Sequence, residues 1–525
     1  MIKDGKIWLG SSADGSQALL LPKMANRHGL VAGATGTGKT VTLKVLAESF
    51  SRLGVPVFMA DVKGDVTGIM EPGTDTPKTT ESRKAFGLDE AGFAFRGCPV
   101  TIWDLFGKTG IPLRTTISDM GPLLLSRILG LNDLQSDILS IVFHIADENN
   151  LLLIDTKDLK SMLGYVKDHA KDFEEEYGRI SSASIGAITR AVVALEIAGG
   201  DTFFGEPALA ISDWLTRNTD GYGMVNLLDS RSLIGNPSLY STFLLWLISE
   251  LFETLPEVGD CDLPKMVFFF DEAHLLFQDT PKVLQDKIEQ VVKLIRSKGV
   301  GIFFCTQNPR DIPDGILSQL STRIEHGLHA YTPADQKAVK AAAESFRVNP
   351  AFDTYETILA LGTGEAVVSL PDEDGVPGMA QKVTILPPQC SMSAAPEGAA
   401  LQCVKSSLLF SKYSQTQDPE SAYEKLEQQE AEEARQAEAT AAAAAEAKEQ
   451  AKKTAAEEKA RKKEEESEDR KRKKAIGQVG STLAGTVGRE VGKNIGKKFG
   501  SFGRTLGGNV GASIGRGLLN TLLKR

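Results

Sequence analysis

The eight residues Gly33 to Thr40, GATGTGKT, constrain the fold more than any other part of this 525-residue chain. They fit G-x-x-x-x-G-K-[ST], in which glycines let backbone N–H groups surround phosphate oxygens, a lysine reaches the outer phosphates and a hydroxyl binds Mg²⁺. An apolar run from His28 leads into the motif, and residues 41–54 leave it with helical spacing. Strand, loop and helix in this order predict a phosphate site at the helix N-terminus. We discard the alternative of a Gly/Thr-rich surface turn, because motif and context both match.

Composition indicates a globular protein with attached segments. The hydrophobic content of 42% is enough for a core of more than one domain's size. Five cysteines are scattered without C-x-x-C or metal-ligand spacing to the six histidines, which predicts neither disulfides nor a zinc site. The first ten residues do not resemble a signal peptide, and no run of 18 apolar residues occurs. We therefore expect a cytoplasmic protein without a transmembrane segment.

The net charge is divided unevenly along the chain. Residues 470–525 hold thirteen Lys or Arg and one Glu, a charge of +12, so the total of −10 leaves −22 for residues 1–469. Proteins that bind nucleic acid usually carry a basic stripe on the gripping domain, and average charge does not supply one here. A hexameric ring can still gather a few Lys or Arg on loops facing its channel. Charge thus argues against DNA as a partner without excluding it.

The pattern of apolar residues divides the chain into four parts. Residues 1–390 predict an α/β domain with a mostly parallel sheet, because apolar runs of four to six residues bounded by turns are typical of buried parallel strands. Within it, residues from about 111 to 215 have helical periodicity and predict a helical insertion. Residues 391–420 are linker-like, and residues 421–470 favour a charged helix or disordered spacer over a coiled coil, because they lack apolar heptads.

The last part, residues 471–525, is a basic tail with glycine at every fourth position in two runs. Three interpretations stay open for it. The glycines disfavour an isolated helix, which favours disorder or ordering on binding. A stripe of small residues favours self-association of helices, and a basic amphipathic helix favours peripheral contact with an anionic membrane.

A second acidic strand distinguishes hydrolysis from other uses of bound phosphate. In VFFFDEAH, four apolar residues place Asp271 at the end of a strand, where it can hold Mg²⁺ through water, and Glu272 can polarise an attacking water. A kinase would need a pocket for a phosphate acceptor, and a GTPase would show an N-K-x-D-like base reader, which we do not find. The alternative is an acidic pair that caps a helix.

Two further motifs follow. The strand GIFFCT ends in Gln307 and Asn308, amides that can orient a water or sense the γ-phosphate. Arg323 begins a later strand and can stabilise charge on a transferring phosphoryl group, as arginines do across subunit boundaries in ATPases. The alternative for Arg323, and equally for Arg296 and Arg310, is a salt-bridged surface residue.

GATGTGKT, ADVKGD, FFFDEAH and GVGIFFCTQNPRDIPDGILSQLSTRI together resemble the HerA-like branch of the FtsK/HerA P-loop ATPase superfamily, and most closely its bacterial YjgR-type members. The resemblance covers about residues 5 to 390. It implies a RecA-like P-loop core, usually in a hexameric ring, that couples ATP hydrolysis with Mg²⁺ to the movement of double-stranded DNA.

The resemblance also implies roles for single residues. Lys39 would neutralise the β- and γ-phosphates, Thr40 and Asp271 would hold Mg²⁺, and Glu272 would be the general base. Gln307 would be the sensor amide and Arg323 the arginine finger, acting on its own or a neighbouring nucleotide. Asp61 and Lys63 match a family position near the nucleotide without an assigned role. The residues implied to bind the nucleotide are Gly33, Ala34, Thr35, Gly36, Thr37, Gly38, Lys39, Thr40 and Val41.

The chain departs from the family pattern at both ends. HerA proteins typically begin with a small β-barrel that docks a nuclease, and the phosphate loop at residue 33 leaves no room for one. A nuclease partner is therefore not expected. The sequence-based hypothesis is a Mg²⁺-dependent ATPase, in a hexamer, that translocates or unwinds double-stranded DNA. The alternatives are an ATP-regulated oligomeric scaffold and a motor acting on a protein client, which the acidic body suits better.

Overall fold

The computed structural model describes residues 1–233, 237–259, 261–277 and 282–473. The chain divides into two compact units, Met1–Glu432 and Glu433–Arg525. Of the predicted glycine-periodic tail, residues 471–525, only the first three residues are among those described, so the interpretations of that tail stay predictions.

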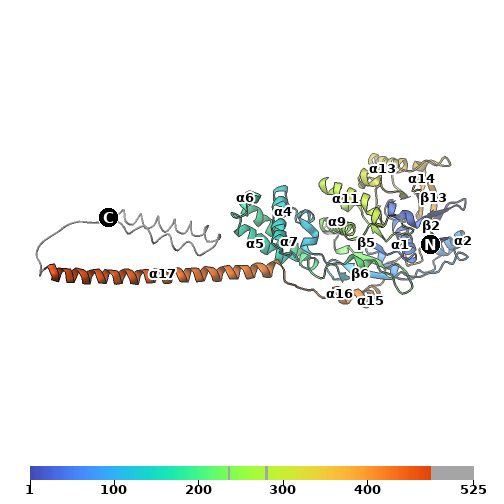
Figure 1. Ribbon diagram of the computed structural model, residues 1–525. Helices are drawn as coiled ribbons and strands as arrows, with labels where there is room; N and C mark the ends of the chain where they lie inside the picture. The colour runs from blue at the N-terminus through green and yellow to red at the C-terminus, as the bar shows by residue number, and fades with distance from the viewer. Residues whose placement is uncertain (234–236, 260, 278–281, 474–525) are drawn as a thin grey trace. The chain divides into compact units, whose positions relative to one another are not determined.

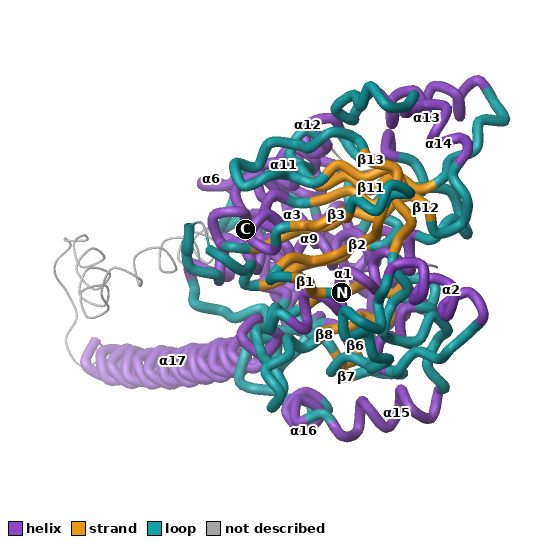
Figure 2. The backbone as a smooth tube through the Cα atoms, turned by 90° about the vertical axis from the view of Figure 1, so that its right-hand side faces the viewer, coloured by secondary structure: helices purple, strands orange, loops and turns teal. Residues whose placement is uncertain are grey.

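In the described residues, the strands of the first unit form one mixed sheet (Figure 2). Its order is β1-β2-β13-β12-β11-β4-β10-β9-β5-β8-β6-β7, with β3 paired to β2. From β11 to β7 neighbouring strands are parallel, and from β11 to β1 they are antiparallel. The bounds are β1 Ile2–Lys3, β2 Lys6–Ser11, β3 Gln17–Leu20, β4 Gly29–Ala32, β5 Val57–Asp61, β6 Val100–Asp104, β7 Ile111–Pro112, β8 Val225–Asp229, β9 Met266–Phe270, β10 Val300–Thr306, β11 Thr322–His326, β12 Glu365–Ser369 and β13 Gln381–Ile385.

The helices connect the parallel strands and cover them, as crossover connections require. The bounds of those outside the insertion are α1 Lys39–Arg52, α2 Pro77–Phe86, α9 Pro237–Thr254, α10 His274–Phe277, α11 Lys282–Leu294, α12 Asp314–Leu317, α13 Pro333–Glu344, α14 Thr354–Ala360, α15 Glu397–Ser406, α16 Leu408–Tyr413 and α17 Ala422–Lys473.

Aromatic side chains show that the sheet is buried on both faces. On one face, Phe50 of α1 lies 6.5 Å from Phe269 of β9, measured between ring centroids. On the other face, Phe270 of β9 lies 6.0 Å from Phe304 of β10, which lies 6.0 Å from Phe277 of α10. Alternate residues of a strand point to opposite faces, so a strand covered on both must be apolar throughout. This explains the continuous apolar runs and gives helices on both sides, as predicted.

Between β7 and β8 the chain forms the helices of the predicted insertion, which gather beside the sheet (Figure 1). Their bounds are α3 Ile117–Ile128, α4 Asp133–Glu148, α5 Thr156–Asp168, α6 Glu174–Tyr177, α7 Ser182–Leu195 and α8 Asp201–Phe203. α7 packs on α4 and α5, and α3 packs on α9 of the core. Asn132 and Asp155 cap α4 and α5 by accepting backbone N–H bonds, which satisfies donors that the first turn leaves unpaired.

The segment after β13 stays bound to the core. The carboxylate of Glu48 on α1, 1% exposed, accepts hydrogen bonds from the backbone N–H groups of Gln389 and Cys390 at 3.0–3.1 Å. α15 packs on β6 and α16 on β7, and the buried Tyr413 accepts a bond from Arg114 at its carbonyl. The first unit therefore continues to Glu432, past residue 390 where the sequence predicts the domain to end, because backbone groups of the predicted linker have partners in the core.

Candidate nucleotide-binding site

The predicted phosphate loop lies between β4 and α1, at the carboxyl edge of the parallel strands. Its glycines have positive φ values: 148° at Gly33, 80° at Gly36 and 121° at Gly38. A Cβ atom added at Gly33 would meet the Cβ of His326, whereas one added at Gly36 would meet nothing within 4 Å. The loop thus needs glycine for its backbone conformation, and at Gly36 it faces open space.

Lys39 opens α1 and reaches back across the loop. Its Nζ donates to the carbonyl oxygens of Gly33 at 2.6 Å and Ala34 at 2.9 Å, and burial lowers its pKa. The residue before it, Gly38, provides no side-chain cap for the helix. The unpaired N–H groups of the first turn of α1 and the ammonium of Lys39 are therefore donors beside the phosphate loop. Such donors at a helix N-terminus bind an anion.

His326, at the end of β11, holds the loop from the neighbouring strand. Its Nδ1 pairs with the carbonyl oxygen of Glu365 at 2.8 Å, so this nitrogen carries the proton, and Nε2 accepts from the hydroxyl of Thr42 at 2.8 Å. Burial lowers the pKa of His326 to about 4. The N–H of Gly364 also donates to the carbonyl of Thr37 at 3.0 Å. No local sequence pattern indicates this clamp, because its residues lie about 300 positions from the loop.

The predicted catalytic carboxylates follow β9, two strands from the phosphate loop. Glu272 has a φ of 49°, a left-handed conformation that costs a non-glycine residue about 1 kcal/mol. Its carboxylate lies 2.7 Å from Nζ of Lys63 and 3.2 Å from Nδ1 of His274. Burial alone would raise the pKa of Glu272, but the bond and charge of Lys63 outweigh burial and lower it. The pKa of Asp271 is raised by burial and then by the neighbouring charge of Glu272.

Gln307 connects the phosphate loop with Glu272. It follows β10, the strand between β4 and β9. Its Nε2 donates to both carboxylate oxygens of Glu272 at 3.3 Å, and its Oε1 accepts from the hydroxyl of Thr35 at 3.4 Å. Asn308, the other predicted amide, accepts from the N–H of Arg310 and so shapes the following turn. The structure thus brings the phosphate loop, Glu272 and Gln307 together.

Arg323 lies elsewhere. It stands at the amino end of β11 beside Leu30, whereas the phosphate loop follows the carboxyl end of β4. Its guanidinium donates to the carbonyls of Leu317 and Leu320. It lies in a mainly basic cavity of about 680 Å³, which is also lined by Arg310, Lys337 and Lys340 and by the acidic Asp314 and Glu344. Burial lowers its pKa. The chain does not place Arg323 at its own phosphate loop, so of the two predicted targets only a neighbour's nucleotide stays open.

In the ADVKGD segment, the structure shows contacts for Asp61 and Lys63, whose roles the sequence does not assign. Asp61 accepts from the backbone N–H groups of Gly64 at 2.6 Å and Val66 at 3.1 Å, which folds the segment back to the site. Burial raises its pKa to about 6. Lys63 pairs with Glu272, as above. Asp65, which we did not single out, accepts from the hydroxyl of Thr40 at 3.2 Å. Its position four residues after a buried strand, in the same motif, was the available signal.

The residues at this edge fit a magnesium ion that arrives with a nucleotide. Thr40 offers a hydroxyl oxygen, and Asp271 and Asp65 offer carboxylates, the oxygen ligands that Mg²⁺ prefers. The Oδ1 atom of Asp65 is buried without a hydrogen-bond partner. In the described ranges, no three His, Cys, Asp or Glu side chains form a metal cluster. Mg²⁺ at phosphate sites usually takes part of its coordination from the substrate phosphates.

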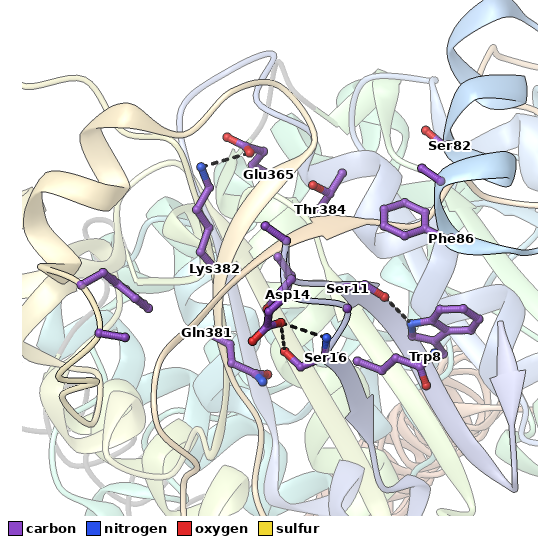
Figure 3. A pocket seen from close by; sticks show the side chains of 18 of the residues that line it. Trp8, Ser11, Asp14, Ser16, Ser82, Phe86, Glu365, Gln381, Lys382 and Thr384 are labelled. Atoms are coloured by element: carbon purple, nitrogen blue, oxygen red, sulfur yellow. Dashed lines mark hydrogen bonds and ion pairs between the residues drawn. The ribbon is translucent and has the colours of Figure 1, made fainter.

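A separate polar cavity of about 950 Å³ lies among the β2–β3 hairpin, α2, β12 and β13 (Figure 3). Its side chains pair with one another: Lys382 lies 3.1 Å from Glu365, and Nε1 of Trp8 donates to the hydroxyl of Ser11 at 3.2 Å. No residue of 33–41 lines it. It is therefore not the phosphate site.

One helical stretch in the described residues, Ser182–Phe203, is long and apolar enough to cross a membrane. Core helices of soluble proteins pass the same test. Ile185, Ile188 and Val192 are buried in the insertion, where α7 packs on α4 and α5, and Arg190 interrupts the apolar run. Only one face of the stretch is thus buried, and Val193 and Ile197 are exposed.

Comparison with known proteins agrees with this geometry. A family model described as "Helicase HerA-like C-terminal" matches residues 7–512. A protein of Methanocaldococcus jannaschii named as a probable helicase is 31% identical over 125 residues, 23% of this chain and 22% of that protein. The DNA double-strand break repair helicase HerA of Sulfurisphaera tokodaii is 33% identical over 99 residues, 19% of each chain. The chain thus matches about a fifth of the length of these relatives.

Solved structures of the plasmid coupling protein TrwB share the fold. The form with the ATP analogue ADPNP has a TM-score of 0.52 and 15% identity, covering 76% of this chain and 92% of TrwB. The form with the GTP analogue GDPNP has a TM-score of 0.50 and 14% identity, with the same coverage. These likenesses, with the parallel sheet and the loop between β4 and α1, confirm the predicted RecA-like P-loop fold.

Proposed function

The chain belongs to the HerA-like helicase family, and from this premise we propose that it hydrolyses ATP with Mg²⁺ and uses the energy, in a hexameric ring, to translocate or unwind double-stranded DNA. The observation that carries the hydrolysis is the arrangement around Glu272. Lys63, His274 and Gln307 hold its carboxylate in one orientation, and Gln307 also contacts the phosphate loop. A carboxylate so fixed is placed to act on a water beside the terminal phosphate.

Each side chain then has a step in the reaction. Lys39 and the first-turn N–H groups of α1 bind the phosphate oxygens. Thr40 and Asp271 would hold Mg²⁺, which would supply neutralisation of the charge on the phosphates. Glu272 accepts a proton from a water whose oxygen forms a bond to the γ-phosphorus. The bond from that phosphorus to the bridging oxygen breaks, which yields ADP and phosphate, and the proton later passes from Glu272 to solvent.

The position of Arg323 supports a ring. An arginine that acts on phosphoryl transfer must reach the nucleotide, and this one lies at the amino end of β11, away from its own phosphate loop. We propose that it completes the site of a neighbouring subunit. The basic cavity that it shares with Lys337 and Lys340 supports this role, since developing negative charge would be stabilised there.

There are two candidates for the molecule that such a ring would move, DNA and a protein. The curated relatives named as helicases support DNA. The charge of −22 on residues 1–469 supports the second candidate, a protein client, since an acidic surface repels the phosphate backbone. An ATP-regulated scaffold, the remaining alternative, would not need the bonds that fix Glu272 beside the phosphate loop.

The test is ATP turnover of the full chain, alone and then with double-stranded DNA, single-stranded DNA and RNA at two salt concentrations. Glu272→Gln should abolish turnover, whereas the matched exposed control Glu373→Gln should keep it. Stimulation by double-stranded DNA that declines as salt rises would support the DNA motor, because phosphate contacts release counterions. Turnover that depends on Glu272 but ignores every nucleic acid would refute DNA as the load.

A further inference from the structure

Asp65 occupies a place beside the phosphate loop that the proposed mechanism does not use. It lies in the segment after β5, and its Oδ2 accepts from the hydroxyl of Thr40 at 3.2 Å. Thr40 is the residue whose hydroxyl is expected to meet Mg²⁺. A carboxylate other than the predicted Asp271 therefore contacts Thr40, the residue at the centre of the expected metal site.

Two neighbours besides Thr40 fix Asp65 in this position, Asp61 and Lys44. The carboxylate of Asp61 binds the N–H groups on either side of it, those of Gly64 and Val66. The ammonium of Lys44, one helical turn after Thr40 on α1, donates to the backbone carbonyl of Asp65 at 2.8 Å. Residues four apart lie on the same face of a helix. Through Thr40 and Lys44, α1 therefore binds both the side chain and the backbone of Asp65.

One oxygen of Asp65 remains without a partner. Its Oδ1 is buried and makes no hydrogen bond. An ionised carboxylate only accepts, so its missing partner must be a cation or a donor. The ammonium groups nearby are engaged elsewhere: Lys44 with three carbonyl oxygens, and Lys63 with Glu272. A buried unpaired carboxylate oxygen is unfavourable unless binding later supplies its partner.

From these contacts we propose that Asp65 is a residue of the magnesium site: with Thr40 and Asp271 it holds the ion that accompanies the nucleotide, directly or through a water of the ion's shell. This role rests on the proposed function, in which the phosphate loop takes a magnesium nucleotide. It differs from a purely structural role, in which Asp65 would only tie the segment after β5 to α1.

The test compares ADP binding by the full chain in Mg²⁺ and in EDTA, with a fluorescent ADP derivative as the probe. The quantity of interest is the dissociation constant in EDTA divided by the dissociation constant in Mg²⁺. This ratio reports how much the ion strengthens ADP binding, and it does not depend on hydrolysis. Asp65→Asn should lower this ratio at least tenfold and change binding in EDTA by less than twofold. The control Asp75→Asn removes the same charge from an exposed site beside Arg83 and should leave the ratio at the wild-type value.

Two results would overturn the role of Asp65 alone: a wild-type ratio in Asp65→Asn, or an equal loss of ADP affinity in Mg²⁺ and in EDTA, which would indicate a structural role. If thermal melting shows that Asp65→Asn does not fold, Asp65→Glu replaces it. This variant keeps the charge but moves the carboxylate by one methylene, so the ratio should fall at least threefold, and an unchanged ratio overturns the role. A wild-type chain that does not bind ADP would overturn the proposed function as well.

Discussion

Protonation of His326 should loosen the clamp on the phosphate loop as pH falls. Both ring nitrogens are used, Nδ1–H as a donor to Glu365 and Nε2 as an acceptor from Thr42, so an added proton breaks the second bond. The pKa of His326 is about 4 in the folded chain and 6.5 as the ordinary value. Between these two pH values the unfolded chain binds the extra proton and the folded chain does not. The contribution of His326 to the free energy of unfolding is therefore fully present above pH 6.5 and is lost as the pH falls towards 4. At 1.36 kcal/mol per pKa unit, the loss is about 3 kcal/mol.

The measurement is urea unfolding of wild type and His326→Gln from pH 7.5 to pH 4, monitored through the fluorescence of the buried tryptophans. Glu325 and Asp61, with pKa values raised by burial to about 8 and about 6, have the opposite dependence on pH. They are present in both proteins and cancel in the difference. The cost of the substitution itself is a constant offset. The free energy of unfolding of wild type relative to His326→Gln should fall by about 3 kcal/mol, and a difference independent of pH would refute the clamp.

Three further predictions concern the site and its support. Lys63→Met removes the largest interaction that opposes the burial of Glu272 and so raises the pKa of Glu272, which should move the acid limb of the kcat–pH profile to higher pH; an unmoved limb would contradict the pairing. Gly68→Ala places a methyl group against the carbonyl of Ser393 and should lower the free energy of unfolding by about 1–3 kcal/mol in urea, unless the segment shifts at no cost. Mixing inactive Arg323→Ala with inactive Glu272→Gln should restore turnover, since some interfaces then hold both intact residues; no recovery would argue against action across subunits.

The parallel part of the sheet could be predicted because each strand is specified locally. The run MVFFF is apolar at every position because helices cover both faces of β9. The carboxyl ends of parallel strands meet at one edge, so Asp271, Glu272 and Gln307 had to approach the phosphate loop. Their motifs were sufficient to place them.

What could not be predicted depends on contacts between distant segments. Lys63 and Glu272 are about 200 residues apart, and no local pattern indicates that an exposed lysine will pair with a buried carboxylate. The antiparallel strands β12 and β13 extend the sheet beyond β11; β12 is buried at four of its five positions, whereas β13 alternates in burial, and the partners of both depend on the rest of the fold. The sequence around His326 is that of an ordinary strand, and its contact with the phosphate loop depends on the pairing of β11 with β4.

The segment from Gln389 to Met392 shows why a composition change is a poor guide to a domain boundary. Its sequence is polar and follows two prolines, which is typical of a linker. Yet α1, the helix that begins at the phosphate loop, binds it twice: Glu48 accepts from its N–H groups, and Lys44 donates to two of its carbonyls while also holding Asp65. A buried Lys and a buried Glu on one helix require partners, and only backbone groups from a distant segment supply enough of them. The chain leading to α15 is thus fixed to the same helix that presents Lys39, so a displacement of α1 on nucleotide binding would move the start of the C-terminal segment directly.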